Sequence, residues 1–539
     1  MTMNSSGPIS LAGTTAGQSI EIELGGSGTT QLSLNDTNVR ALAGKTTAGS
    51  AVIMPTDFYG KTYVMPLSNS LRLRASASAY LTRTPATAGN KQKWTWSGWV
   101  KRGQLSTSQG LIAASSGTPT SFGFGTAAGN DQIFFTISGV GVGNTTAIFR
   151  DPAAWYHVVI AFDTTQATAA NRVLIYVNNV NYPLSSTLVS LNGFYEINNN
   201  TPQQIGTTGV TGSTTYTDAY LADVYFIDGQ ALTPSSFGKT NSSTGQWVAA
   251  PYTGTYGTNG FHLDFSSIAT TSGSNTGLGK DTSGNGNYFN TNNISVTAGT
   301  TYDAMIDVPS GNGYTSGTQP ASNYCVLDPI IPGTTNLINA NLTRNGSVRT
   351  NVGTMILTNG KYYFETTIQD ANGNGGVGVK QSTAYPLESY DTSKCATYFA
   401  NGEYKIEGAA QTPGFATYTN GDVIGCAVDT TQSPAKIWWA KNGTWQGTGN
   451  PTTAGYSLTA GLDYYFMVLH GSGSSTTTAS VNFGQQPFAQ SVPSGFKALC
   501  TSNLPASTVP KGNIYMDATT YTGTGSALSV TNAAGFEPD

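Results

Sequence analysis

Hydrophobic and polar residues alternate with a period of two along most of this chain, which is the pattern of half-buried β-strands. Residues 94–100 and 172–177 are clear examples, and the second run leads directly into Asn178 and Asn179, a pair that favours a tight turn. Residues 155–162 are instead apolar or aromatic throughout except for His157. Such a run predicts a strand covered on both faces, at the centre of a sheet.

The strand pattern divides the chain into parts. Strand signals cover 67–300 and return over 336–505, and a proline-containing stretch at 301–335 separates them. We therefore expect an anchoring segment at 1–66, a sandwich domain at 67–300, a linker at 301–335, a second sandwich at 336–505 and a tail at 506–539.

Residues 1–66 carry only short alternating pieces, at 19–24 and 30–34, which predict strands too short to close a sandwich. Such strands need a partner surface, so we expect this segment to complete the sheet of a neighbouring protein. Asn35 or Asp36 can cap a short helix that runs on to Ala43.

Composition agrees with an all-β fold. Glycine supplies 65 of the 539 residues, and charged residues supply only 10%. Aromatic residues reach 11%, enough large apolar groups to build folded cores. We predict an N-terminal extended anchor followed by two antiparallel β-sandwiches, with helix in less than about a tenth of the chain against the usual third.

Charge and cysteine content narrow the classes of partner. The net charge is −4 and no extended run of Lys or Arg occurs, which argues against nucleic acid as a partner. No apolar stretch reaches the length of a membrane span and the start has no signal-peptide pattern, so we expect folding in a cytoplasm and no membrane insertion. The four cysteines lack C-x-x-C spacing and predict buried free thiols.

The middle of the chain resembles a laminin-G or concanavalin A-like jelly roll. The resemblance lies in residues 96–102, in 155–159 with 173–178, and in 220–232. It implies a lectin-like sandwich of about 200 residues.

Three further stretches are similar to segments of tailed-bacteriophage tail and virion proteins. They are residues 220–238, residues 281–287, and residues 34–44 with 54–61. This resemblance, which composition does not show, implies a virion protein.

Residues 336–500 resemble a SPRY (B30.2) domain, a bent β-sandwich whose variable loops bind protein partners. The matching stretches, in order, are residues 362–365, 421–429, 437–445 and 481–488. Within the third, Asn442-Gly443 is expected to form a hairpin turn, since both residues tolerate a positive φ.

A pair of carboxylates could catalyse glycoside hydrolysis in this chain, because concanavalin A-like folds include glycosidases. Glu21 and Glu23 alternate on a predicted strand, but the Glu-x-Asp-x-x-Glu arrangement of those enzymes is missing, so solvated surface charge is the favoured interpretation. Glu403 and Glu407 could form an acid/base couple, yet the SPRY resemblance places them near a loop and a short strand. We expect no catalytic residues. A polysaccharide depolymerase of concanavalin A-like fold remains the alternative function.

Metal sites and cofactors are not indicated. His157, His262 and His470 lie apart in apolar or aromatic strand settings, without Cys or acidic residues at ligand spacing. Asp223 and Asp228 fall on or beside a strand where laminin-G-like domains sometimes hold Ca²⁺, but a solvent-facing Asp223 with Val224 buried explains the pattern as well and is the favoured interpretation. We expect no metal ligands and no cofactor, and calcium stays open.

Exposed aromatic residues on loops are the best candidates for ligand contact, because they offer large area at a low entropy cost. Tyr385, Tyr390, Tyr404 and Trp445 flank turn-forming residues in the SPRY-like part. For each residue taken singly, a core or rim position in the sandwich is the favoured interpretation.

Together these observations predict a structural and adhesive component of a bacteriophage particle: a tail fibre, an appendage or a capsid-bound decoration. Residues 1–66 would contact other virion proteins, and the lectin-like domains would bind a host-surface glycan or protein. A homo-oligomer is expected, with a trimer favoured for avidity. The protein would reside in the virion after assembly in the host bacterial cytoplasm.

Overall fold

The structure is a computed structural model of the full chain. It describes residues 3–529 except for the following positions: 27–28, 30, 44, 46–49, 60–62, 116, 126–129, 138–139, 186–188, 211–214, 310–314, 317–318, 332–336, 347–349, 372–374, 385–386, 388–391, 448, 470–476, 510–511, 513–514, 516–522, 524 and 527–528. Contacts divide the chain into two compact units. The N-terminal unit comprises residues 1–66, 234–254 and 506–539, and the sandwich unit comprises residues 67–233 and 255–505.

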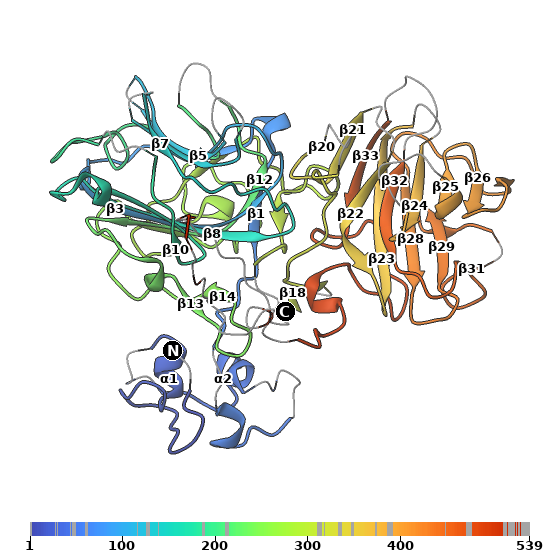
Figure 1. Ribbon diagram of the computed structural model, residues 1–539, viewed down its shortest axis with the longest axis horizontal. Helices are drawn as coiled ribbons and strands as arrows, with labels where there is room; N and C mark the ends of the chain where they lie inside the picture. The colour runs from blue at the N-terminus through green and yellow to red at the C-terminus, as the bar shows by residue number, and fades with distance from the viewer. Residues whose placement is uncertain are drawn as a thin grey trace. The chain divides into compact units, whose positions relative to one another are not determined.

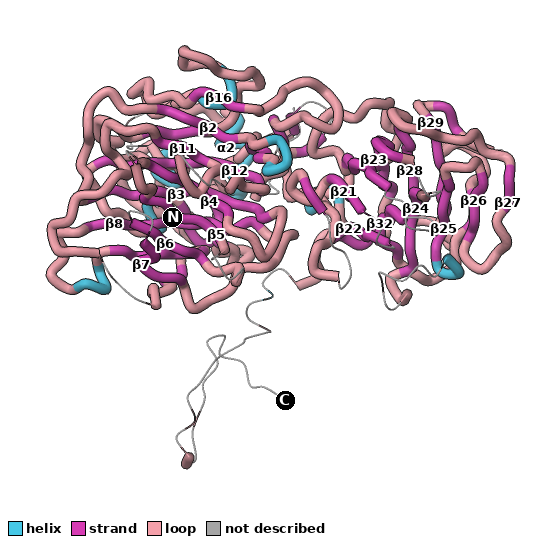
Figure 2. The backbone as a smooth tube through the Cα atoms, turned by 90° about the horizontal axis from the view of Figure 1, so that it is seen from above, coloured by secondary structure: helices cyan, strands magenta, loops and turns pink. Residues whose placement is uncertain are grey.

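The chain is all-β, as predicted. Within the described residues the α-helices are α1 (Ile20–Glu23) and α2 (Thr37–Leu42), so helix content stays far below a tenth. Figure 2 shows strands throughout both sandwiches, joined by loops, with helices as short cyan pieces. The other helical elements are single 3₁₀ turns: η1 (Thr56–Phe58), η2 (Ala75–Ala77), η3 (Ala169–Asn171), η4 (Pro234–Ser236), η5 (Gly277–Gly279), η6 (Thr392–Lys394) and η7 (Thr501–Asn503). No described helix has the length and hydropathy that a membrane crossing requires.

The first sandwich consists of two antiparallel sheets. One has the order β10-β9-β8-β3-β12-β1-β17, with β15 also paired to β12; the other has the order β16-β2-β11-β4-β5-β6-β7. The strands of the first sheet are β1 (Ser70–Leu73), β3 (Lys93–Arg102), β8 (Trp155–Asp163), β9 (Val173–Val177), β10 (Val180–Asn181), β12 (Ala219–Asp228), β15 (Phe261–Leu263) and β17 (Ala304–Met305). Those of the second are β2 (Tyr80–Arg83), β4 (Gln109–Ala114), β5 (Thr120–Phe124), β6 (Ile133–Ile137), β7 (Val140–Asn144), β11 (Gln203–Ile205) and β16 (Asn290–Asn292).

Aromatic rings from both sheets form the core of the first sandwich. Trp94 stacks on Phe162 with ring centroids 4.8 Å apart, and Trp96 meets Phe122 of the opposite sheet edge-on at 5.1 Å. The apolar run at 155–162 becomes β8, which lies between β3 and β9 and is buried along almost its whole length. The predicted turn after β9 also forms, with Asn178 and Asn179 at φ values of 48° and 71°.

The second sandwich also has two sheets, coloured yellow to orange-red in Figure 1. One has the order β20-β21-β33-β23-β28-β29-β30, with β31 also paired to β29; the other has the order β22-β32-β24-β25-β26-β27. The first contains β20 (Leu337–Ile338), β21 (Thr343–Gly346), β23 (Lys361–Asp370), β28 (Val423–Asp429), β29 (Lys436–Lys441), β30 (Thr444–Trp445), β31 (Tyr456–Ser457) and β33 (Thr477–Asn482). The second contains β22 (Thr350–Leu357), β24 (Gly376–Gln381), β25 (Cys395–Phe399), β26 (Glu403–Ile406), β27 (Thr412–Pro413) and β32 (Tyr464–Leu469).

The sheets of the second sandwich are joined by rings and by one buried hydrogen bond. Phe364 and Phe466 meet edge-on at 4.7 Å between the sheets. The indole N–H of Trp439 on β29 donates to the carbonyl of Val377 on β24 at 3.0 Å. Asn442 and Gly443 connect β29 to β30 with φ values of 49° and 81°, so the predicted hairpin turn is present.

The stretch predicted as a linker, 301–335, is packed against both sandwiches. It supplies β17, which pairs with β1, and the small hairpin β18 (Thr315–Ser316) with β19 (Gln319–Pro320). Cys325, Val326 and Leu327 are fully buried, and all four cysteines of the chain are buried free thiols. The prolines therefore exclude long strands here without making the stretch a free connection.

A buried lysine ties this stretch to the first sandwich. Lys101 on β3 is fully buried, and its ammonium donates to Asp307 Oδ2 at 2.8 Å, Asn323 Oδ1 at 2.8 Å and the Tyr324 carbonyl at 2.6 Å. Trp155 Nε1 donates to the other oxygen of Asp307 at 3.1 Å. The ammonium and the carboxylate thus have partners on every side, which burial of charge requires.

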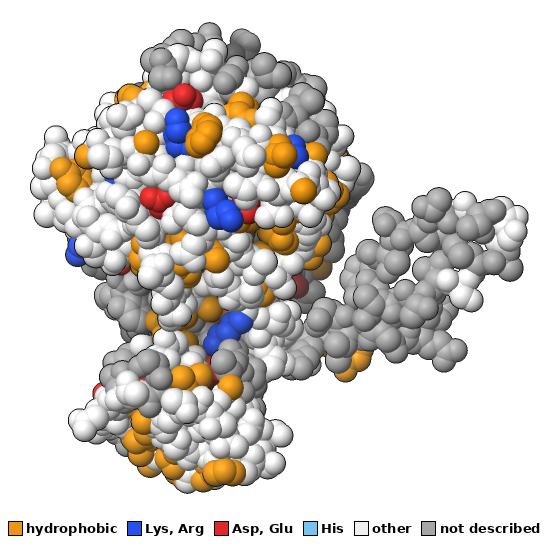
Figure 3. Space-filling model, turned by 90° about the vertical axis from the view of Figure 1, so that its left-hand side faces the viewer, with side chains coloured by type: hydrophobic (Ala, Val, Ile, Leu, Met, Phe, Trp, Pro, Cys, Tyr) orange, Lys and Arg blue, Asp and Glu red, His pale blue; other side chains and the backbone are white. Residues whose placement is uncertain are grey.

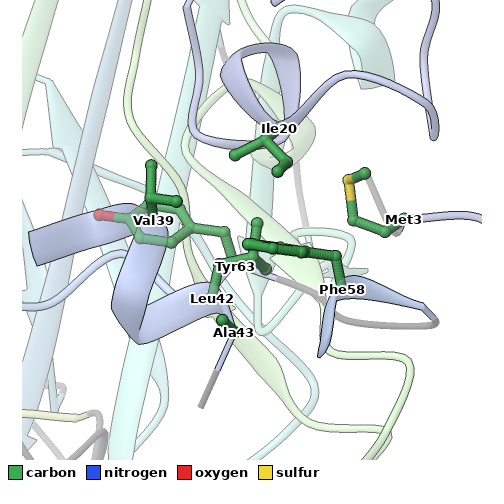
Figure 4. Close-up of a cluster of buried hydrophobic side chains, with 7 residues drawn as sticks. All are labelled: Met3, Ile20, Val39, Leu42, Ala43, Phe58 and Tyr63. Atoms are coloured by element: carbon green, nitrogen blue, oxygen red, sulfur yellow. The ribbon is translucent and has the colours of Figure 1, made fainter. Parts of the chain in front are cut away.

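The N-terminal unit has a small core of its own. Met3, Ile20, Val39, Leu42, Ala43, Phe58 and Tyr63 form a cluster of buried side chains, drawn in Figure 4. Residues 19–24, expected to be a strand, form helix α1 instead: Ser19 caps it through its hydroxyl, which accepts from the N–H of Ile22. The described residues of 1–66 contain no strand, so the strand expected at 19–24 is wrong, while donation of a strand to a neighbouring protein stays a prediction. The short helix predicted to follow Asp36 is present as α2.

The surface charge expected at Glu21 and Glu23 is also wrong. Both residues are buried in the N-terminal unit. Glu23 Oε1 accepts from the Tyr63 N–H at 2.7 Å and pairs with Lys239 Nζ at 2.7 Å. Lys239 lies on β13 (Gly238–Thr240), which pairs with β14 (Trp247–Ala249). The partner is 216 residues away in sequence, which is why no local pattern could show it.

Candidate binding site

The structure describes two of the four aromatic residues that were expected to contact a ligand. Tyr385 and Tyr390 lie outside the described residues, as does His470. Tyr404 and Trp445 are described, and they belong to separate aromatic clusters.

Tyr404 lies on β26 as a half-buried rim residue. Its ring stacks on Phe415 at 4.4 Å and lies 4.9 Å from the ring of Tyr456 on β31. Tyr456 in turn lies 5.9 Å from Trp439, a core residue of the sheet that faces Tyr404. The cluster closes one edge of the second sandwich, and Tyr404 contributes both to that closure and to the surface.

Trp445 follows the β29–β30 hairpin and packs against a different group. This cluster contains Tyr363, Ala427, Trp438 and Phe496, with Trp445 partly buried beside it. Trp438 and Trp439 are consecutive on β29, and their side chains therefore point to opposite faces of the sheet. Trp445 consequently shares no aromatic cluster with Tyr404.

Glu403 and Glu407 do not form an acid/base couple. Glu407 is buried, and it accepts hydrogen bonds from Gln381 Nε2 at 2.8 Å, Thr459 Oγ1 at 2.5 Å and Tyr464 Oη at 2.7 Å. Glu403 is bound by its neighbour Asn401 instead. Burial raises the pKa of Glu407, but these hydrogen bonds outweigh it and hold the pKa below the ordinary value. Glu407 is therefore an ionised acceptor that fixes strand ends.

The expectation of a solvent-facing Asp223 is wrong. β12 carries a bulge between Ala222 and Tyr225, where Asp223 has a φ of 53° and is buried. A bulge interrupts the alternation of faces, so side-chain direction there cannot be read from period two. Asp223 Oδ1 lies 2.7 Å from His262 Nε2, an acidic neighbour that sequence spacing did not reveal.

His262 is held on all sides. Its Nδ1 lies 2.9 Å from Thr282 Oγ1, and its ring stacks on Tyr225 at 4.1 Å. Thr282 belongs to the 281–287 stretch, whose polar side chains fasten it to the fold. Asp281 accepts from the His262 N–H, and Asn287 donates to the carbonyls of Thr258 and Gly260. The 281–287 stretch therefore has a structural role, because its hydrogen bonds attach it to β15.

Asp228 and His157 likewise serve the fold. Asp228 accepts from Asn90 N, Asn198 Nδ2 and Asn259 N at 2.6–3.1 Å, so donors rather than acceptors surround its carboxylate. His157 is buried beside Ser97 Oγ at 2.9 Å, and burial lowers its pKa to about 3, which keeps the ring neutral. Across the described part of the chain, no three His, Cys, Asp or Glu side chains gather as metal ligands would.

The most exposed aromatic side chain of the first sandwich lies elsewhere, on the loop of residues 189–195. Phe194 is 64% exposed and Leu191 is 52% exposed, and they lie three positions apart on this 189–195 loop. Lys91 Nζ lies 5.7 Å from the centre of the Phe194 ring. The face drawn in Figure 3 is mainly polar, with hydrophobic side chains scattered over it.

The 189–195 loop is fastened through its backbone. Gln92 Nε2 donates to the Asn192 carbonyl at 2.9 Å, and the Asn192 N–H donates to the Thr164 carbonyl at 2.8 Å. Tyr195 inserts its ring against Phe162 of the core at 5.9 Å. The loop therefore presents Leu191 and Phe194 from a fixed base, as pre-organised binding loops do. The one available signal was an Asn-Gly turn flanked by apolar residues, which sequence analysis did not use.

Comparison with known proteins assigns the first sandwich to a broad class. Residues 75–238 match the family model of the concanavalin A-like lectin/glucanases superfamily. The lectin-like resemblance of the middle of the chain is therefore confirmed. The match covers the strands from β2 to β12 and includes the 189–195 loop.

Solved structures give further similarities. The SPRY domain of human HERC1 is 21% identical over 27% of this chain and 89% of its own, with a TM-score of 0.21. Another human SPRY domain is 18% identical over 26% of this chain and 89% of its own, with a TM-score of 0.21. A heptameric SAP-like pentraxin from Limulus polyphemus is 12% identical over 31% of this chain and 78% of its own, with a TM-score of 0.24. No curated protein matches the sequence.

Proposed function

We propose that this protein is a non-enzymatic structural and adhesive component of a bacteriophage particle, resident in the virion after assembly in the bacterial cytoplasm. Its sandwiches bind a glycan or protein of the host surface, and its N-terminal unit attaches it to other virion proteins. The observation that carries the binding role is the exposed pair Leu191 and Phe194 on a loop whose backbone is hydrogen-bonded to its neighbours. The phage assignment rests on the resemblance of residues 220–238 and 281–287.

The N-terminal unit supports an attachment role through its independent core. Its buried cluster and the Glu23–Lys239 ion pair give it a defined surface that does not depend on a partner. Attachment through such a surface does not require the strand donation expected from the sequence. Ile53, 55% exposed, is one of the large apolar side chains that the described part of this unit offers to a partner, together with Val509 and Tyr515.

A polysaccharide depolymerase is the alternative. The carboxylates considered for catalysis are engaged otherwise: Glu23 pairs with a lysine, and Glu407 accepts from three donors. We therefore favour binding over hydrolysis. Release of reducing ends from host polysaccharide by the purified chain would reverse that preference.

Labelling and competition test the proposal directly. Antibodies against the purified chain should label phage particles in electron micrographs, and the chain should compete with those particles for adsorption to host cells. An unlabelled particle population would contradict the virion assignment. Labelled particles together with absent competition would contradict the adhesive role.

Oligomeric state gives a second test. We expect a homo-oligomer on the particle, most simply a trimer, because repeated weak sites gain avidity when they are linked. Native mass spectrometry of the concentrated full chain should show the trimer. Monomer alone under these conditions contradicts the expectation.

A further inference from the structure

We propose that Phe194, with Leu191 and Lys91, forms a platform on which one sugar ring of a surface glycan stacks. This proposal deepens the proposed adhesive function by naming the contact site and its ligand class. It moves the principal contact from the second sandwich, where the sequence placed it, to the 189–195 loop of the first.

The side chains of Phe194 and Leu191 are largely exposed to solvent. An aromatic side chain that is 64% exposed loses the hydrophobic stabilisation that burial would give it, so the fold gains little from Phe194 itself. Leu191, at 52% exposed, adds a second apolar group three positions away. Two such side chains on one loop form a patch, whereas the other large exposed hydrophobic residues of the first sandwich, Ile148, Val180 and Ile268, lie on separate segments.

The backbone of the 189–195 loop is held in place by its neighbours. The 189–195 loop is fixed by bonds to Gln92 and Thr164 on two neighbouring connections and by the Tyr195 ring against the core. Arg172 Nη1 adds a bond to the Val189 carbonyl at 2.7 Å. Gly193 permits the close turn, since a Cβ there would come within 2.6 Å of Tyr195 Oη. A ligand that stacks on Phe194 thus avoids most of the cost of ordering the loop.

The chemistry of the patch fits a sugar ring. The C–H groups on one face of a pyranose are weakly positive and stack on the negative face of an aromatic ring, as cations do. Lys91 Nζ lies over one face of the Phe194 ring, 5.7 Å from its centroid, and can donate to a hydroxyl or carboxylate of a sugar bound beside it. The neighbouring side chains of Asn90, Gln92 and Asn192 are amides, which suit hydroxyl groups.

Size and charge argue against other occupants. A stable protein interface takes roughly 800 Å² from each partner, and two side chains on one tight loop offer a small fraction of that area. A membrane surface requires a cluster of about four to eight basic residues, whereas the basic side chains shown in contact with this loop are Lys91 and Arg172, and Arg172 is engaged with backbone carbonyls. A single sugar ring matches the patch in both respects.

Binding of the full chain to a printed array of bacterial capsular and lipopolysaccharide glycans tests the proposal. The wild-type chain should bind at least one printed glycan, and Phe194→Ala should weaken that binding at least about tenfold, as loss of an aromatic anchor does. Phe194→Trp should keep it. Lys91→Ala should cause a smaller loss that is largest at low salt.

Ile268→Ala is the matched control, because Ile268 is 63% exposed on the same sandwich and away from the 189–195 loop. It should bind as the wild type does. All variants should keep the wild-type melting temperature, which separates a contact role from a role in folding. Each variant is measured at a density where the array reports single-site affinity.

Three results would overturn the proposal. They are wild-type chain that binds no printed glycan, Phe194→Ala that binds like wild type, and loss of binding that depends on Tyr404 while Phe194 is dispensable. Binding to vesicles of phosphatidylglycerol and phosphatidylethanolamine that depends on Phe194 would show a lipid ligand instead and would also overturn it. Particle labelling by antibody is independent of all these outcomes, so the virion assignment can stand or fall separately.

Discussion

Single polar residues in this protein are mostly engaged in fastening loops to strands. Glu407 binds three donors at the rim of the second sandwich, and Asp228 gathers three donors in the first. Hydrogen bonds to a charged acceptor are worth about 1.5–3 kcal/mol each, roughly twice the neutral kind. The chain has few charged residues, but carboxylates such as Glu407 and Asp228 each accept several hydrogen bonds that stabilise the fold.

We expect Glu407→Ala to lower the free energy of unfolding by about 2 kcal/mol, because Gln381, Thr459 and Tyr464 lose a charged acceptor. Chemical denaturation at pH 7 measures the change. Glu403→Ala, at the start of β26 and four residues before Glu407, is the control and should change the stability little, since its side chain accepts from the neighbouring Asn401.

Acid should produce the same loss in the wild-type chain. The pKa of Glu407 is lower in the folded state than its ordinary value, so its contribution is present above the ordinary Glu pKa. It disappears as the pH falls through the folded-state pKa. The difference in stability between wild type and Glu407→Ala should therefore shrink on acidification. A constant difference from pH 7 to acid would contradict this account.

At the scale of elements, glycines determine how closely neighbouring strands approach. Gly123 on β5 lies so close to the backbone of β4 that an added Cβ would be 1.9 Å from the Gln109 carbonyl oxygen. A Cβ added to Gly141 on β7 would have no neighbouring atom within 4 Å. Both lie in one sheet, so they make a matched pair.

We expect Gly123→Ala to lower the free energy of unfolding by about 3 kcal/mol or more, because the backbone of β4 would have to move. Gly141→Ala should change the stability little and can raise it slightly, since alanine restricts the unfolded chain. Thermal and urea unfolding of both variants provide the measurement. Equal effects at the two positions would show that the close approach at Gly123 is relieved by a small shift.

At the scale of the whole molecule, the two sandwiches are joined by buried polar contacts. Residues 339–341 all have φ values near 60° and form a left-handed turn. The Ala340 N–H donates to Asp218 of the first sandwich at 2.6 Å, and Tyr220 Oη donates to the Ala340 carbonyl at 3.1 Å. Lys101 with Asp307 forms a further buried contact, between the first sandwich and the 301–335 stretch.

This junction should respond to pH through Asp218. Burial raises the pKa of Asp218 to about 7, although the Ala340 N–H opposes the shift. A raised carboxyl pKa means that the folded state holds a proton more tightly than the unfolded state. The contribution is full below the ordinary Asp pKa and is lost as the pH rises toward 7.

Asp218→Asn should therefore flatten the pH dependence of the unfolding free energy between about pH 4 and 7, whatever its effect on absolute stability. Urea unfolding across that window supplies the slopes. Asp151→Asn, at an exposed position of the same sandwich, is the control for an Asp-to-Asn change outside the junction. An unchanged slope in Asp218→Asn would mean that Asp218 stays ionised in the fold.

The buried ion pair gives a larger effect. Lys101→Met leaves the Asp307 carboxylate buried without its cation, which should lower the free energy of unfolding by about 3–5 kcal/mol. Adding Asp307→Asn should restore part of that loss. Lys361→Met removes a lysine that is 42% exposed from its pair with Asp429 and should lower the stability by at most about 1 kcal/mol. Similar losses for the two lysines would contradict the distinction between buried and exposed pairs.

The sequence by itself determined the fold class, the central strand β8 and the turns at Asn178–Asn179 and Asn442–Gly443. These depend on local alternation of side chains and on residues that tolerate positive φ, and both are written in consecutive residues. The helix α2 could be predicted from its cap for the same reason. Burial of the four cysteines also followed from composition.

Only the tertiary structure decided which polar groups meet. Glu23 with Lys239, Asp223 with His262 and Lys101 with Asp307 are pairs whose partners lie far apart in sequence. The bulge in β12 and the Ser19 cap of α1 override the period-two pattern locally. The exposure of Phe194 was equally out of reach, because a loop aromatic is identical in sequence whether its ring packs inward, as Tyr195 does, or outward.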